Sequence, residues 1–171
     1  MELYHHIFKT NFGFSALEFK LNPFQVNKIY LPQKNEKQIK AVLNKDSIYG
    51  EDEKANQVAQ IIQAYFNGQI INHDQIPWHL LPLDNYTELQ QKVYNTAALI
   101  PYGQVKSYGS IAKEIGKSGA SRFVGSCMAK NPFPVLIPCH RVIRSDGSMG
   151  GFGGGTEMKK KMQKMEKKGK T

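Results

Sequence analysis

A proline-broken stretch in the middle of the chain most constrains how it can fold. Residues 76–85 include Pro77 and Pro82, which lack the backbone N–H that helices and sheets use. The charge changes at the same place. Residues 1–85 contain 8 Lys and 9 acidic residues (net −1), and residues 86–171 contain 15 Lys and Arg and 5 acidic residues (net +10), which gives +9 in total. We expect two small domains, residues 1–85 and 86–171.

The cysteine count and the hydropathy exclude several classes of protein. Cys127 and Cys139 are the two cysteines, too few for the disulfide framework of a small secreted domain, so each is expected to be a free thiol. No apolar run approaches the roughly 20 residues that cross a bilayer, and the first residues lack the pattern of a secretion signal. We expect an intracellular protein, cytoplasmic or, in a eukaryote, nuclear, with no membrane partner.

Metal and cofactor binding are not expected. His5, His6, His73 and His79 have no cysteine or paired carboxylate at ligand spacing, which favours surface or packing roles. Residues 151–153, Gly-Phe-Gly, resemble part of a dinucleotide-binding loop. They do not open a strand–turn–helix unit with an acidic residue about 20 positions later, so we reject a cofactor there.

The first half has the pattern of strands followed by a helix. Residues 7–31 alternate aromatic or β-branched residues with polar ones, which predicts two or three antiparallel strands. Residues 53–66 carry apolar side chains three and four positions apart and end at Asn67 and Gly68, which predicts an amphipathic helix. We therefore expect a small α/β domain with an antiparallel sheet.

The second half has mainly helical patterns. The expected helices are residues 89–100 with Thr87 as the cap, a short helix after Ser107, residues 120–130 and a helix after the glycine-dense loop 147–155. Gly116 fits the left-handed position that closes the short helix, so it and the next helix form a helix-turn-helix pattern. The fold class is expected to be α/β, in the α+β sense, with Cys139 in the helical domain.

Residues 135–143 form an apolar run that three reactive side chains interrupt, Cys139, His140 and Arg141. Burying such groups is costly unless they are hydrogen-bonded, so this pattern marks a candidate site. An imidazole beside a thiol can take its proton and produce a nucleophilic thiolate. In a regular strand the two side chains point to opposite faces, so His140 needs an irregular backbone or a bridging water to reach Cys139. The alternative is a buried small hydrophobe beside a core histidine.

Residues 131–143, NPFPVLIPCHRVI, resemble the active-site motif of the O6-alkylguanine-DNA alkyltransferases. Further matches at family-like spacing are residues 100–103, Ser107, Tyr108, residues 122–125, Gly154 and Glu166. The resemblance covers about half of the chain. By analogy of length and pattern, it implies the family's small, ribonuclease-H-like α/β domain for residues 1–85.

The resemblance implies that the alkyl group of O6-alkylguanine, and of O4-alkylthymine, moves irreversibly from DNA to Cys139, which acts once. His140 is implied to deprotonate Cys139 through a water molecule, and Glu166 to orient the imidazole. Asn131 is implied to link the recognition helix to the active-site strand. Tyr108 is implied to rotate the nucleotide out of the duplex and to bond to the flipped base.

The implied partner is double-stranded DNA, bound through the minor groove by a monomer. A base must leave the stack before its alkyl group can be reached, and Arg122 is implied to fill the gap. The residues implied to line the base pocket are Met128, Pro134, Val142, Phe152 and Gly153. Phosphate contacts by the basic half fit binding without sequence preference, although a lysine run such as residues 159–170 also fits a solvated helix face.

Other residues near the motif receive no chemical role. Cys127 is interpreted as a packing residue, and Arg144 is left unassigned. Phe152 stands where many family members carry tyrosine, and Ala129 replaces a basic residue of some relatives. The first domain has no cysteine, so the structural zinc of some members is not expected.

Three other classes of protein remain as alternatives. A cysteine hydrolase needs an oxyanion hole and turns over. A helix-turn-helix regulator needs a dimer with spaced half-sites. A damage sensor of the alkyltransferase-like group lacks the reactive cysteine, whereas this chain has Cys139.

Overall fold

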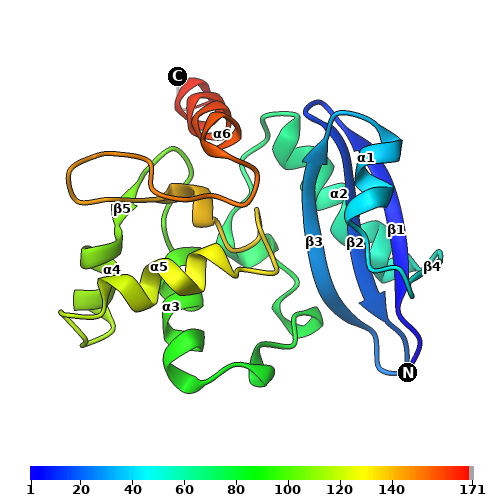
Figure 1. Cartoon of the computed structure of the whole chain (residues 1–171), viewed down its shortest axis with the longest axis horizontal. Helices are drawn as coiled ribbons and strands as arrows, with labels where there is room; N and C mark the ends of the chain where they lie inside the picture. The colour runs from blue at the N-terminus through cyan, green and yellow to red at the C-terminus, as the bar shows by residue number, and fades with distance from the viewer. Residues whose placement is uncertain (170–171) are drawn as a thin grey trace. The chain divides into compact units, whose positions relative to one another are not determined.

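The computed structural model describes residues 1–169 of the chain. They form two compact units, Met1–Pro82 and a second that begins at Leu83 (Figure 1). The division lies inside the proline-broken stretch. No helix within residues 1–169 combines the length and the apolar character needed to cross a membrane.

The first unit is built on a four-stranded sheet with the order β3-β2-β1-β4. Its strands are β1 (Tyr4–Thr10), β2 (Gly13–Lys20), β3 (Gln25–Gln33) and the two-residue β4 (Ile48–Tyr49). The first three are antiparallel neighbours, as the alternating pattern predicts, and β4 runs parallel to β1. Gly13 opens β2 at φ 125°, where an added Cβ would meet the Gln33 carbonyl, so the β1–β2 turn requires glycine.

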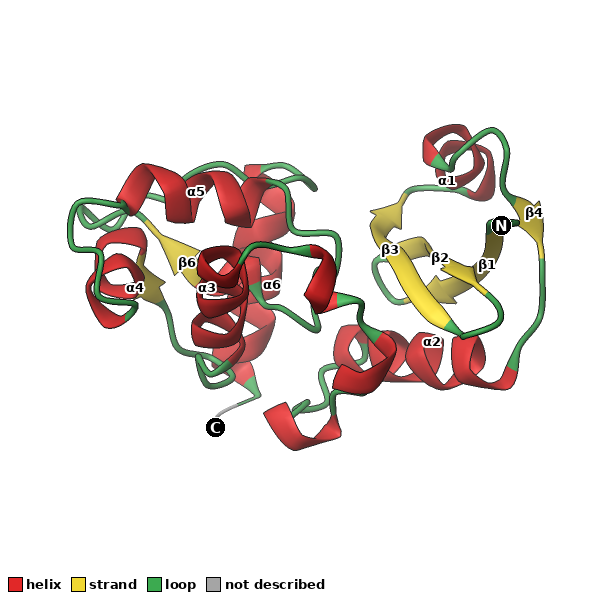
Figure 2. Ribbon diagram, turned by 90° about the horizontal axis from the view of Figure 1, so that it is seen from below, coloured by secondary structure: helices red, strands yellow, loops and turns green. Residues whose placement is uncertain are grey.

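Two helices cover opposite faces of this sheet (Figure 2). Helix α2 (Glu53–Phe66) begins at Asp52, whose side chain accepts from two backbone N–H groups, and it buries the apolar stripe that the sequence predicts. Helix α1 (Glu36–Val42) was not predicted. It has seven residues and buries only Ile39, which is too short a stripe for a helical period to be recognised.

The connection to the second unit is more regular than expected. Two short 3₁₀ turns, η2 (Trp78–Leu80) and η3 (Leu83–Asn85), lie in the stretch 76–85, which was predicted to lack regular structure, and a third, η1 (His73–Gln75), comes just before it. Pro77 stands just before η2. A 3₁₀ turn of three residues needs few backbone N–H donors, so prolines at its border do not interrupt it.

The second unit is mainly helical, with helices α3 (Glu88–Ala98), α4 (Tyr108–Glu114), α5 (Ser121–Ala129) and α6 (Thr156–Lys168). A parallel pair of two-residue strands, β5 (Lys106–Ser107) and β6 (Val142–Ile143), accompanies them. Thr87 caps α3 in a reciprocal pair with Gln90. Helices α3, α4 and α5 pack against one another and form the core of this unit.

The connection between α4 and α5 has the expected form. Ser107 caps α4 by accepting from the Ser110 backbone N–H at 3.0 Å. Gly116 follows the helix at φ 76°, a backbone region that favours glycine, and the chain turns into α5 within five residues. The side chains at the start of α5 are thereby presented to solvent, Arg122 among them.

Candidate active site

Cys139 lies on a 3₁₀ turn, η4 (Cys139–Arg141), and not on the strand that the apolar run suggested. Only Val142 and Ile143 of that run are strand. The correction has a physical reason, because Pro134 and Pro138 cannot donate to a sheet ladder. Val135 has φ 74°, a left-handed conformation that a β-branched residue adopts only when its surroundings enforce it.

Asn131 holds the segment before Cys139 in this irregular shape. Its Nδ2 donates to the Ile137 carbonyl at 2.8 Å, and its Oδ1 accepts from the Phe133 backbone N–H at 3.0 Å. The residue follows the end of α5, so it connects that helix with η4, where the motif led us to expect a strand.

His140 and Glu166 form the buried centre of the site. The His140 Nε2 lies 2.5 Å from Oε1 of Glu166, and the two side chains are 0% and 1% exposed. Burial lowers the pKa of His140, and the neighbouring charges of Arg141 and Lys159 lower it further, against the opposing effect of Glu166. The imidazole is therefore neutral near neutral pH. With Nε2–H donated to Glu166, its Nδ1 is the basic nitrogen.

Glu166 is held as a carboxylate. Burial alone raises its pKa, but the hydrogen bonds and charges of His140 and Arg141 lower the pKa to about 2. Its Oε2 also accepts from the Gly103 backbone N–H at 2.8 Å. These contacts join α6 to the turn after α3 and to η4.

Arg141 is a site residue to which sequence analysis gave no role. Its Nε donates to Glu166 Oε2 at 3.0 Å and its Nη2 to Oε1 at 3.1 Å, and its Nη1 donates to the Ile100 carbonyl at 2.7 Å. The guanidinium also lies 5.6 Å from the centre of the Tyr102 ring. A bidentate arginine of this kind fixes the plane of the carboxylate that it binds. The sequence signal for this role was the position of a charged side chain, Arg141, inside an apolar run.

Sequence analysis also gave Lys159 no role, because this residue belongs to the lysine run 159–170, which fits a solvated helix face. It is fully buried, and its Nζ donates to the Val142 carbonyl at 2.6 Å and to the Met149 carbonyl. The ammonium lies 5.9 Å from the centre of the Tyr108 ring. Burial lowers the pKa of Lys159 to about 8.

The Cys139 thiol is buried, with 6% of the residue exposed. Burial raises the pKa of Cys139, while the Asn131 side chain, the Lys159 charge and the backbone N–H groups of Cys139 and His140 lower it in part. The thiol is therefore the resting form, and groups that stabilise the thiolate already surround it.

Tyr108, the first residue of α4, is half-buried beside the glycine-dense loop. A Cβ added to Gly150, which has φ 68°, would lie 2.6 Å from the Tyr108 hydroxyl. Burial raises the pKa of Tyr108, and the charge of Cys139 raises it further, so the phenol stays protonated near neutral pH.

The remaining predicted residues differ in their exposure to solvent. Met128, Pro134 and Val142 are buried in the second unit. Arg122 and Gly153 are exposed, and Phe152 is half-buried. Arg122 is the second residue of α5, whereas Met128 lies near the other end of the same helix.

Cys127 has the surroundings of a packing residue. It is 3% exposed on the inner side of α5, and its carbonyl accepts from the Tyr94 hydroxyl at 3.4 Å. Burial raises the pKa of Cys127, which disfavours the reactive thiolate. Within residues 1–169, no three His, Cys, Asp or Glu side chains gather in a way that could hold a metal ion.

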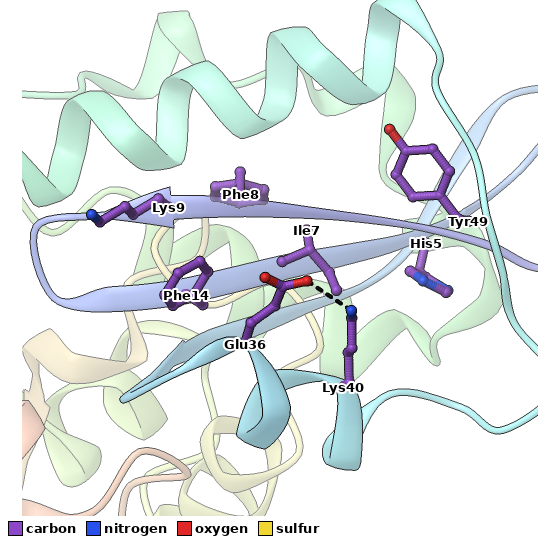
Figure 3. Close-up of a pocket in the computed structure, with 8 residues that line it drawn as sticks. All are labelled: His5, Ile7, Phe8, Lys9, Phe14, Glu36, Lys40 and Tyr49. Carbon is purple, nitrogen blue, oxygen red and sulfur yellow. Dashed lines mark ion pairs between the residues drawn. The ribbon is translucent and has the colours of Figure 1, made fainter.

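The amino-terminal unit contains a hollow of about 350 Å³ on the α1 side of its sheet (Figure 3). Its lining consists of His5, Ile7, Phe8, Lys9, Phe14, Glu36, Lys40 and Tyr49. Glu36 and Lys40 are paired there at 2.7 Å, and both are more than half exposed. Both cysteines, Cys127 and Cys139, lie in the second unit and not at this hollow.

Comparison with known proteins points to one family. Residues 88–168 match the sequence profile described as "6-O-methylguanine DNA methyltransferase, DNA binding domain". A methylated-DNA–protein-cysteine methyltransferase of Methanosarcina acetivorans is 37% identical over 121 residues, which are 71% of this chain and 74% of that protein. One of Mycobacterium bovis is 40% identical over 107 residues, 62% of this chain and 61% of that protein, so the match spans less than two thirds of its length.

The fold agrees with a solved structure along nearly the whole chain. The crystal structure of Mycobacterium tuberculosis OGT in complex with DNA superposes with a TM-score of 0.73 and 27% sequence identity. The superposition covers 97% of this chain and 94% of that one. The similarity therefore includes the first unit, for which the sequence supplied no motif.

Proposed function

The chain belongs to the methylated-DNA–protein-cysteine methyltransferase family, and we propose that it repairs DNA by moving the alkyl group of O6-alkylguanine onto its own Cys139. The observation that carries the proposal is the buried His140–Glu166 contact of 2.5 Å, made by the residue that follows the buried Cys139 on the same 3₁₀ turn. A neutral imidazole oriented by a carboxylate is suited to removing a proton from a neighbouring group.

The proposed reaction begins with a proton transfer. The Cys139 proton passes, through a bridging water, to Nδ1 of His140, which Glu166 holds in the required tautomer. The sulfur electron pair then forms a bond to the alkyl carbon as the bond from that carbon to O6 breaks. Guanine departs with the electron pair of that bond and becomes protonated, which restores the charge balance as His140 loses its proton.

The reaction is proposed to occur once per protein molecule. The product is a thioether on Cys139, and a thioether has no proton to lose and is a poor leaving group. The protein would then be consumed stoichiometrically, with O4-alkylthymine as a second substrate.

We propose that helices α4 and α5 present the DNA-binding surface. Arg122 is exposed at the start of α5 and can enter the minor groove to fill the space of a flipped nucleotide. Tyr108 begins α4 near the glycine-dense loop, where its protonated hydroxyl can donate to the flipped base. The related OGT was crystallised in complex with DNA, which supports DNA as the partner.

The proposed base pocket lies between the loop and the interior of the second unit. Buried Met128, Pro134 and Val142 supply apolar walls, and Phe152 and Gly153 belong to the loop that closes over the base. Asn131 acts as a positioning residue, because its two hydrogen bonds shape the turn that carries Cys139.

The proposed thiol chemistry requires a reducing compartment, the cytoplasm or a nucleus, and we propose that the protein acts there as a monomer. The nucleophile must remain a thiol, which oxidising compartments do not favour. No metal or cofactor enters any proposed step, since the acid–base and nucleophilic groups are all side chains.

The experiment is intact-mass spectrometry after the protein is mixed with a duplex that contains one O6-methylguanine, followed by peptide mapping. One added methyl group on Cys139, with stoichiometric repair, is expected. Cys127→Ala is the matched control and should accept the methyl group normally, whereas Cys139→Ala should bind the duplex and remain unmodified.

Three results would refute the proposal. A wild-type protein that binds the lesion but stays unmodified would be a damage sensor. Methyl transfer in Cys139→Ala would show that another group is the acceptor. Repeated turnover by one protein molecule would instead indicate a hydrolytic mechanism.

A further inference from the structure

Lys159 is buried although it begins a run of three lysines. In helix α6, Met162 and Glu166 follow Lys159 by three and seven positions. The three residues therefore lie on one face of the helix, the face that packs into the second unit. Lys160 and Lys161 fall on the exposed face. A lysine ammonium is rarely buried without compensating partners, so Lys159 needs a specific explanation.

Two carbonyl oxygens account for most of the hydrogen bonding of this ammonium. One belongs to Val142 of β6, whose own backbone N–H donates to the Cys139 carbonyl and closes the 3₁₀ turn. The other belongs to Met149, in the loop next to Gly150. Neither carbonyl carries a full negative charge, so the positive charge of Lys159 is left without a resident counter-ion from these contacts.

The group that responds to that charge is the Cys139 thiol. The Lys159 charge lowers the pKa of Cys139, and the Cys139 charge in turn raises the pKa of Lys159, which burial alone lowers. The other titratable groups that respond to the Cys139 charge are Tyr94 and Tyr108, and His140 is the next residue of the same 3₁₀ turn. Burial raises the pKa of both phenols and lowers that of His140, so all three are neutral near neutral pH.

We propose that Lys159 is a positioning residue that holds one fixed positive charge beside Cys139, so that the thiolate formed during alkyl transfer is its counter-ion. This inference rests on the proposed function and deepens it, because His140 removes the proton and Lys159 stabilises the anion that remains. The carbonyls of Val142 and Met149 keep the ammonium in place before the thiolate exists. A preorganised charge requires no rearrangement at the moment of reaction.

A purely structural role for Lys159 makes different predictions. If the ammonium only links β6 to the loop, a neutral side chain of the same length changes stability and leaves the ionisation of Cys139 unaltered. The test must therefore measure thiol ionisation itself. It can be done on the free protein, without DNA, so its result does not depend on whether the proposed repair reaction occurs.

The experiment measures the rate at which iodoacetamide alkylates Cys139 as a function of pH, in a Cys127→Ala background that leaves one thiol. Lys159→Met should move the profile to higher pH and lower the rate at neutral pH by about tenfold or more. Lys159→Arg, which keeps the charge, should retain most of the wild-type rate. Lys164→Met removes an exposed lysine from the same helix and should leave the profile unchanged.

The inference is overturned if folded Lys159→Met has the wild-type profile, or if Lys159→Met and Lys159→Arg shift it equally. Should Lys159→Met fail to fold, the reciprocal measurement decides the question. NMR titration of the Lys159 ammonium in Cys139→Ser should show a lower pKa than in the wild type, because the thiolate that raises it is gone. An unchanged titration in Cys139→Ser would also overturn the inference.

Discussion

The Nε2 atom of His140 lies 2.5 Å from Oε1 of Glu166, and both residues are closed off from solvent. Arg141 binds the same carboxylate through Nε and Nη2. The carboxylate therefore has a fixed plane, and the imidazole has a fixed tautomer with Nδ1 as its basic nitrogen. This relationship leads to two predictions about Glu166.

Glu166→Gln should slow methyl transfer by about a hundredfold or more, because it removes the carboxylate that orients the proposed general base, His140. Glutamine can donate to Nε2 and stabilise the wrong imidazole tautomer. Single-turnover transfer from an O6-methylguanine duplex measures the effect, with DNA affinity as the control. A Glu166→Gln protein that is folded and transfers at the wild-type rate would remove Glu166 from the mechanism.

Glu166 should also make the second unit sensitive to acid. Its pKa is lowered on folding from 4.5 to about 2, so its stabilisation is complete above pH 4.5 and is lost as the pH falls toward 2. The shift corresponds to roughly 3 kcal/mol. His140, whose pKa is also lowered, adds a loss that begins below its ordinary 6.5, because the unfolded chain binds the proton first.

Urea unfolding at a series of pH values measures this dependence. In Glu166→Gln, the free energy of unfolding should no longer fall with pH between pH 4.5 and 2 through this group. Glu157→Gln changes an exposed residue of the same helix, and its free energy of unfolding should fall as in the wild type. Parallel wild-type and Glu166→Gln slopes across that window would contradict the assignment.

Arg122→Ala should slow transfer from duplex DNA by about tenfold, because filling the gap offsets part of the unstacking cost of a few kcal/mol. Transfer from a single-stranded oligonucleotide should change much less, since no gap has to be filled. Lys113→Ala removes one exposed charge from α4 and serves as the control. Equal losses on the two substrates would mean that Arg122 contributes only charge.

Gly150→Ala should impair transfer, because its Cβ would lie 2.6 Å from the Tyr108 hydroxyl and its φ of 68° disfavours alanine. Gly151→Ala is the matched control, since an added Cβ there meets nothing within 4 Å. Single-turnover rates of the two variants provide the comparison. If they lose activity equally, the contact between the loop and Tyr108 is not the cause.

DNA affinity should fall steeply with salt. A second half of net charge +10 is expected to bind mainly through phosphates, and proteins with several phosphate contacts lose about 10³-fold or more in affinity between 50 and 200 mM salt. Fluorescence anisotropy with an undamaged duplex measures the slope. A flat dependence would show that phosphate contacts do not dominate.

The features that the sequence predicted well are those that depend on local pattern. The alternation in residues 7–31 and the apolar stripe of 53–66 correspond to β1–β3 and α2. The motif around Cys139 identified the family, and the structure brings His140 and Glu166 together across 26 residues of chain. That pairing came from the resemblance, because no local rule places a glutamate of α6 beside an imidazole of η4.

The features that were missed depend on tertiary contacts. Lys159 and Lys160 are neighbours of the same type, and only the packing of α6 decides that one is buried and the other exposed. The 3₁₀ turn at Cys139 arises from prolines and from Asn131 acting at a distance of several residues, which a hydrophobic period does not report. Arg141 needed a partner, Glu166, that lies 25 residues away.

The network around Glu166 also has a consequence in time. The Glu166 carboxylate is hydrogen-bonded to Gly103, His140 and Arg141. The turn after α3, η4 and α6 leave the ribosome in that order, so the last segment, α6, joins the other two. While α6 is still being synthesised, Cys139 has neither the oriented imidazole nor the buried ammonium beside it. The proposed nucleophile therefore acquires these surroundings only when α6 docks and completes the second unit.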